Sequence, residues 1–198
     1  KIEMEILRNN EVIGYNNYFF ERDGETTTVK NQYKFEVKLL SATIFKVEGY
    51  GEEIYLNDRL ISFQSKTLQN KKEKFVSLKL DNSNKKFNIK GSSYSGEASL
   101  KNIIGNWWSH KILQAESQIS PISGSIKEQL VTFIGKENVA INGKEFETDH
   151  FKLTSKDMSL PEDKRLNFDI WLDKKTSVIV KVTYERMGNW EYRLKNIE

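Results

Sequence analysis

The sequence predicts an all-β protein, a single strongly curved antiparallel meander that forms a half-barrel or open barrel of about 10 to 12 strands. Short segments of alternating apolar and polar residues follow one another, separated by turn signals at intervals of about 8 to 12 residues. Aromatic residues make up 12% of the chain within a hydrophobic total of 37%, and rings favour the half-buried surfaces of strands. No helical pattern of about 10 to 15 residues separates the segments, which argues against a parallel α/β fold.

The first half of the chain is typical of successive hairpins. Ile2, Met4 and Ile6 alternate with charged residues, and Asn9-Asn10 then turns the chain into a return strand. Strands are predicted at residues 12–20, 29–39, 43–49, 53–56, 60–67, 75–80 and 86–90. The strand at 29–39 carries its apolar residues at a period of two, so we expect one of its faces to be buried.

Residues 91–124 interrupt this rhythm and are predicted to form a crossover or lid within a single domain spanning residues 1–198. The segment is rich in Gly and Ser and offers only short helical turns, at 100–104 and 107–113. The β pattern then resumes at 130–134, turns at 135–138 and continues at 139–141. Asn142-Gly143 is the strongest hairpin signal, because a type I′ turn needs positive φ at both central residues. The last strands are predicted at 146–154, 167–172, 178–184 and 190–194.

Charge and composition limit the kinds of partner that the protein could bind and the cellular compartment in which we expect it. The 31 basic and 28 acidic residues are interspersed and leave a net charge of +3, which creates no field that would capture nucleic acid. No apolar run approaches the roughly 20 residues of a transmembrane helix. The chain has no cysteine and begins at Lys1, so we expect a mature exported protein in the periplasm, with the cytoplasm as the alternative.

The final strands carry a first group of candidate site residues. Counting by two separates an apolar face from a face that carries His150, Asp169, Trp171 and Arg193. Neighbouring strands would bring these side chains within reach of one another. A His beside an Asp can act as a base or orient a bound group, whereas the alternative interpretation is cross-strand salt bridging on a solvated face. The direction in which this face points decides between the two.

A second group of candidates consists of Trp107, Trp108 and His110 in the crossover segment. Two large aromatic side chains in a Gly- and Ser-rich loop could cap a pocket and offer a flat apolar wall with an indole donor. Alternatively, they plug the end of the sheet as core residues.

Other chemistry has little support in the sequence. Two histidines and no cysteine leave too few ligands for a transition metal, and the EF-hand pattern for calcium is missing. No G-x-S-x-G elbow and no phosphate-binding glycine pattern occurs, so we expect no serine nucleophile and no cofactor. Lysines at positions 71, 72, 74, 85 and 86 form a basic patch without arginine, which is best explained as a solvated hairpin end.

Several short motifs occur along the chain: the segment 53–63 with Ser65-Lys-Thr67, the Trp107-Trp108 loop, Ser123-Gly-Ser125, Asn142-Gly143 and Asp169-Ile-Trp-Leu-Asp173. Together they resemble an uncharacterised domain-of-unknown-function family of exported proteins from Gram-negative bacteria. The resemblance covers nearly the whole chain and implies no catalytic residues. More distantly, the strand count and curvature are similar to the LolA/LolB-like lipoprotein-carrier fold, which implies an incomplete barrel over a lipid-binding hollow. The weak helical segments depart from that fold and favour a smaller groove.

The sequence therefore favours a periplasmic, non-enzymatic protein that binds a lipophilic or amphipathic small molecule. The residues expected to contact this ligand are Trp107, Trp108, His110, His150, Asp169, Trp171 and Arg193. One alternative is an envelope-assembly or structural module that presents a sheet edge to an envelope protein. A further alternative is an enzyme that uses His150 and Asp169 as an acid–base pair.

Overall fold

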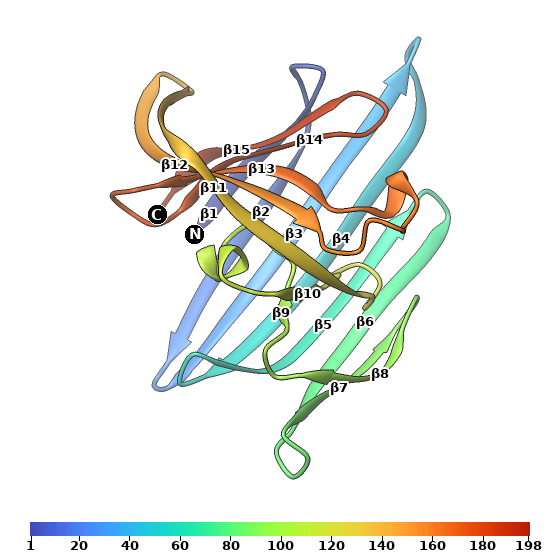
Figure 1. Cartoon of the computed structure of the whole chain (residues 1–198). Coiled ribbons are helices and arrows are strands. Elements are labelled where there is room, and N and C mark those ends of the chain that lie inside the picture. Colours follow the sequence, from blue (N-terminus) through green and yellow to red (C-terminus); the bar gives the residue numbers. More distant parts are fainter.

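The computed structural model describes residues 1–198 and shows one continuous β-sheet with two short 3-10 helices (Figure 1). The first seven strands are β1 (Ile2–Arg8), β2 (Glu11–Asp23), β3 (Thr26–Leu39), β4 (Ala42–Leu56), β5 (Arg59–Gln69), β6 (Lys72–Asp81) and β7 (Lys86–Gly91). The crossover segment contains β8 (Ser95–Ser99), β9 (Ile103–Ile104), the helix η1 (His110–Leu113) and β10 (Ser117–Ile119). After it come β11 (Ile126–Ile141), β12 (Lys144–Ser155), the helix η2 (Glu162–Lys164), β13 (Asn167–Asp173), β14 (Ile179–Glu185) and β15 (Asn189–Ile197).

The sheet contains 15 strands in the order β8-β7-β6-β5-β4-β3-β2-β1-β15-β14-β13-β12-β11-β10-β9 and is not closed into a barrel. The first and last strands of the chain therefore pair in its middle. All neighbouring strands are antiparallel except β9 and β10, which are parallel. The predicted all-β, open and antiparallel fold is confirmed. The strand number exceeds the predicted range of about 10 to 12, in part because β8, β9 and β10 lie in the crossover segment.

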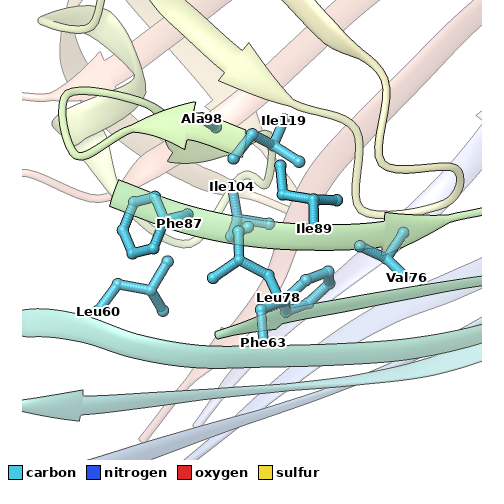
Figure 2. Packing of buried hydrophobic residues seen from close by; sticks show 9 residues of the cluster. All are labelled: Leu60, Phe63, Val76, Leu78, Phe87, Ile89, Ala98, Ile104 and Ile119. Atoms are coloured by element: carbon cyan, nitrogen blue, oxygen red, sulfur yellow. The ribbon is translucent and has the colours of Figure 1, made fainter. Parts of the chain in front are cut away.

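The sheet curls so that its β9–β10 edge lies on the inner face of β5 to β8. Ile104 of β9 and Ile119 of β10 pack among buried side chains of the opposite edge, including Leu78, Phe87 and Ile89 (Figure 2). Ile119 and Leu78 expose no surface at all. The curl is therefore fixed by burial of apolar surface and not by closure of a hydrogen-bonded barrel.

The two layers of the curl approach each other closely where residues 123–124 pass the end of β7. The Ser93 N–H donates to the Ser123 carbonyl oxygen at 2.9 Å. Gly91 and Gly124 face each other beside this bond, and a Cβ on Gly91 would lie 2.5 Å from the Ser123 carbonyl oxygen. The Gly-rich composition of the segment thus reflects a close approach of two backbones.

The crossover segment differs locally from the sequence prediction. Residues 100–104 form no helical turn, since Ile103–Ile104 is strand β9 and pairs with Gln118 and Ile119 of β10. The helical turn predicted at 107–113 is present only as η1, which covers His110–Leu113. Pairing with a distant strand overrides the local preference in the first case.

Two predicted interruptions of the sheet are also absent. β4 is one strand from Ala42 to Leu56, although two strands were predicted there. β11 runs through the predicted turn at 135–138, and a bulge between Phe133 and Gly135 accommodates the irregularity without a turn. The hairpin at Asn142-Gly143 is confirmed, with φ values of 51° and 77°.

The strand connections fall at two ends of the sheet. The chain termini lie side by side at one end, where the Glu198 N–H donates to the Lys1 carbonyl oxygen at 2.9 Å (Figure 1). The turns at 9–10, 40–41, 70–71 and 186–188 lie at the opposite end, together with the loop between β12 and β13. We call this end the distal end.

Packing of the curled edge can be tested with Ile119→Ala. We expect this substitution to lower the free energy of unfolding by about 2 to 5 kcal/mol, because it opens a cavity between the two layers. Chemical denaturation measures the change. The matched control is Leu130→Ala, since Leu130 is 58% exposed, and its effect should stay within about 0.5 kcal/mol. Equal effects of the two substitutions would contradict the packing described above.

Candidate functional site

A hollow of about 560 Å³ lies on the inner side of the curled sheet and reaches toward the distal end. Strands β1 to β6 line one side of it, β13 to β15 line the other, and the crossover segment passes across it. Its volume is within the range of about 300 to 1,000 Å³ that is usual for small-molecule sites. The hollow is therefore the first place to look for a ligand.

Aromatic rings form a continuous wall of the hollow. Trp107 lies 5.0 Å from Phe168, and Phe168 lies 5.3 Å from Tyr184, between ring centroids and edge to face. Tyr184 stacks on Trp190 at 5.7 Å. Phe35 of β3 continues the wall, 5.4 Å from Trp190. Such rings offer a large apolar surface at little entropic cost, because the neighbouring rings already hold them in place.

Polar side chains form the opposite part of the lining, and they bond to one another. The Asn16 side-chain amide donates to the Tyr18 hydroxyl at 2.9 Å, and the Asn31 side-chain amide donates to Asn16 Oδ1 at 2.7 Å. The hydroxyls of Tyr33 and Thr67 lie 2.5 Å apart. These pairs leave few of the polar atoms unsatisfied, so this part of the hollow needs no ligand for its stability.

Four cations line the hollow, namely Lys74, Lys127, Lys164 and Arg186. They form no salt bridge, and Asp163 is the only acidic residue of the lining. Burial, together with the neighbouring charge of Arg186, lowers the pKa of Lys127. The Lys127 ammonium donates to the Lys164 carbonyl oxygen at 2.5 Å, which is a neutral acceptor. The hollow thus carries an excess of positive charge at one end.

A buried carboxyl group holds the crossover segment in place. Glu53 of β4 is 3% exposed, and its Oε1 accepts from the Asn106 amide at 2.6 Å and from the Trp108 indole at 2.9 Å. The Tyr55 hydroxyl donates to its other oxygen. Burial raises the pKa of Glu53 to about 7, although the three hydrogen bonds oppose this shift.

The second predicted group of site residues is divided by the structure. Trp107 lines the hollow, and its backbone N–H donates to the Tyr18 hydroxyl at 3.2 Å. Trp108 packs edge to face against Phe20 and Tyr55 and serves as a donor to Glu53. His110 is exposed at the start of η1. Only Trp107 of the three therefore lies where a ligand in the hollow would touch it.

The first predicted group comes together in the structure, as the strand parity indicated. His150 Nε2 lies 2.9 Å from Asp169 Oδ1, and the His150 ring stacks on Trp171 at 4.4 Å. Arg193 lies further along the same row, opposite Lys181, and pairs with Glu5 at 2.9 Å. Neighbours of opposite parity such as Leu153 and Ile170 are fully buried in the core. The group therefore occupies the face opposite the hollow.

The polar members of this group already have polar partners on their own face of the sheet. Partial burial acts to raise the pKa of Asp169, but hydrogen bonds from Lys152 and His150 prevail and hold it below its usual value. His150 Nδ1 lies 3.1 Å from Glu137 Oε1, so both ring nitrogens face carboxylates. No set of three or more His, Asp or Glu side chains is arranged to hold a metal ion. A role of these residues in ligand binding stays a prediction.

Sequence reasoning did not select most of the side chains that line the hollow. Counting by two places Phe168 and Tyr184 on the apolar face of the final strands, which predicts a place in the core for them. The sequence did contain one signal for the hollow. At inward-facing positions, where other strands carry Val, Ile or Leu, these strands carry aromatic residues, and β3 does the same with Tyr33 and Phe35. The cations at 127 and 186 carried no local signal, because only the curl of the sheet brings them together.

The fold and the hollow define an open, barrel-like β-protein with an internal cavity. The chain belongs to the family described as Domain of unknown function (DUF6134), whose model matches residues 4–195. Among curated proteins, no sequence matches the chain. No helix of the structure has the length and apolar character needed to cross a membrane.

A solved structure confirms the fold class. It is the crystal structure of a beta-barrel-like protein of Domain of Unknown Function DUF1849 from Brucella abortus. The two structures superimpose with a TM-score of 0.64 at 11% sequence identity, over 98% of this chain and 94% of that chain. At this identity the similarity concerns the fold alone.

The pKa of Glu53 predicts how stability depends on pH. The folded state raises this pKa from 4.5 to about 7, so the folded state binds more protons than the unfolded state between these values. Stability should therefore fall as pH rises from about 4.5 to about 7, by roughly 3 kcal/mol in total. Glu53→Gln should remove this slope and make the protein more stable than the wild type at pH 8. Thermal unfolding over this pH range measures it, and an unchanged slope in the variant would contradict the assignment.

Proposed function

We propose that the protein binds an amphipathic anion in the hollow, without catalysing a reaction. The apolar part of the ligand packs along the wall formed by Trp107, Phe168 and Tyr184, and the anionic group pairs with Lys127 and Arg186. The observation that supports this proposal best is the cluster of cations that form no salt bridge and outnumber the one carboxylate, Asp163, in an aromatic cavity.

The energetics of Lys127 favour an anionic ligand over a neutral one. Partial burial of the Lys127 ammonium beside Arg186 and Lys164 costs free energy, and the Lys164 carbonyl oxygen and the charge of Asp163 offset only part of that cost. An anion at this position would replace like-charge repulsion by charge-assisted hydrogen bonds. The same group would then raise the pKa of Lys127 back toward its usual value.

A periplasmic location and a carrier role remain parts of the proposal. They follow from the cysteine-free sequence and from the resemblance to exported proteins and to the LolA/LolB-like carrier fold. An enzyme that uses His150 and Asp169 has less support, because both groups lie on the face opposite the hollow, where each is already in contact with other polar side chains.

Binding of dodecyl phosphate, measured by isothermal titration calorimetry below its micelle concentration, tests the proposal. We expect binding with a negative heat-capacity change, because the alkyl chain leaves water. Lys127→Gln should weaken the affinity about tenfold or more through loss of a charged hydrogen bond, whereas binding of dodecyl maltoside should not change.

The matched control is Lys136→Gln, which removes a lysine of the same strand at an exposed position outside the hollow. Its affinity for dodecyl phosphate should equal that of the wild type. The proposal is wrong if neither amphiphile binds, or if Lys127→Gln and Lys136→Gln have the same effect.

A further inference from the structure

The tip of the β3–β4 hairpin, residues 38–44, projects from the distal end and pairs with no other strand. Pairing of β3 with β2 ends at Phe35 and Gly14, and pairing of β4 with β5 ends at Val47 and Gln69. Beyond these positions, the two strands pair only with each other, as far as the turn at 40–41. Figure 1 shows this hairpin extending past the other turns at the distal end.

The tip of this hairpin is apolar and exposed. Leu39, Leu40 and Ile44 expose 61%, 95% and 55% of their surface. Nearer the sheet, by contrast, Val37 is buried against Ile6. The apolar side chains at the tip therefore contribute nothing to the core, and an exposed apolar cluster of this kind marks an interaction site.

The backbone conformation of the turn gives a second, independent sign that Leu40 is placed there for contact. Five turns of the chain have two consecutive residues with positive φ, and three of them begin with Asn, the residue that tolerates this conformation. Leu40, at φ 48°, is one exception. Met187, at φ 49° and 90% exposed, is the other, and its turn lies at the same end. In both turns a residue other than Asn or Gly adopts a strained backbone conformation, and its apolar side chain is exposed to solvent.

Charges near the tip indicate the chemistry of the partner. The Lys46 backbone N–H donates to the Asn70 side-chain oxygen at 2.8 Å, which holds the β5–β6 turn against the hairpin. Lys71 and Lys72 of that turn, and Lys38 of the hairpin, are exposed and form no salt bridge. Unpaired lysines around an apolar tip match a surface of anionic headgroups above an acyl layer.

We infer that the distal end docks on an anionic lipid surface through the β3–β4 hairpin. Leu39, Leu40 and Ile44 enter the boundary between headgroups and acyl chains, and the neighbouring lysines contact phosphate groups. The tip is too small to bury the roughly 800 Å² per partner of a stable protein interface, whereas shallow insertion into lipid needs only a few apolar side chains. Docking in this orientation turns the cation-lined part of the hollow toward the lipid.

Co-sedimentation with phosphatidylcholine vesicles, with and without phosphatidylglycerol, tests this inference. We expect the protein to bind the vesicles that contain phosphatidylglycerol, and to be released by salt. Leu40→Asn should reduce the partition coefficient about tenfold or more, because one leucine no longer leaves water. Asn suits positive φ, so the variant should unfold at a higher temperature than the wild type, which separates lost docking from lost folding.

The matched control is Leu56→Asn, at the opposite end of β4, where the leucine is 44% exposed. This variant should bind vesicles as the wild type does. Absence of vesicle binding by the wild type, or equal binding by Leu40→Asn, would overturn the inference. A concentration-dependent dimer in sedimentation velocity that Leu40→Asn abolishes would also overturn it, because the tip would then contact a second copy of the chain.

Discussion

The buried carboxyl group of Glu53 is the contact on which the inner architecture depends. It fixes Asn106 and Trp108, and between them Trp107 is placed against the aromatic wall. Strand pairing of β8 with β7 and of β10 with β11, together with the packing of Ile104 and Ile119, holds the rest of the crossover segment. Residues 106–108 belong to no strand, so their position depends on the contact with Glu53. The carboxyl group is costly to bury and is satisfied by three donors, so it specifies one position of the segment more than it stabilises the fold.

The crossover segment then divides the inner face of the sheet into two regions. On one side, Ile104 and Ile119 complete a close-packed aliphatic core. On the other, the rings of Phe168 and Tyr184 line the wall of the hollow. The cations around the hollow and the apolar tip of the β3–β4 hairpin lie at the same end, so binding and docking would share one direction of approach.

Local patterns in the sequence predicted those features that neighbouring residues alone determine, namely turns and the face of a strand on which a side chain lies. Asn142-Gly143 specifies its turn through backbone preference alone, and strand parity placed His150, Asp169 and Trp171 on one face. The side of the curl on which that face lies depends on where residues 100–119 pack, and no pattern near His150 carries that information. The same limit explains why the sequence did not predict the cluster of cations. Lys127 and Arg186 are far apart in the sequence, and only the folded sheet brings them close to each other.

The central claim is that the hollow, and not the opposite face, receives the ligand. Intermolecular nuclear Overhauser effects between ¹³C-labelled dodecyl phosphate and the aromatic side chains of the protein test it directly. The structure predicts contacts from the alkyl chain to the ring protons of Phe168, Tyr184 and Trp107. Contacts to Trp171 and His150, without contacts to those three rings, would contradict it.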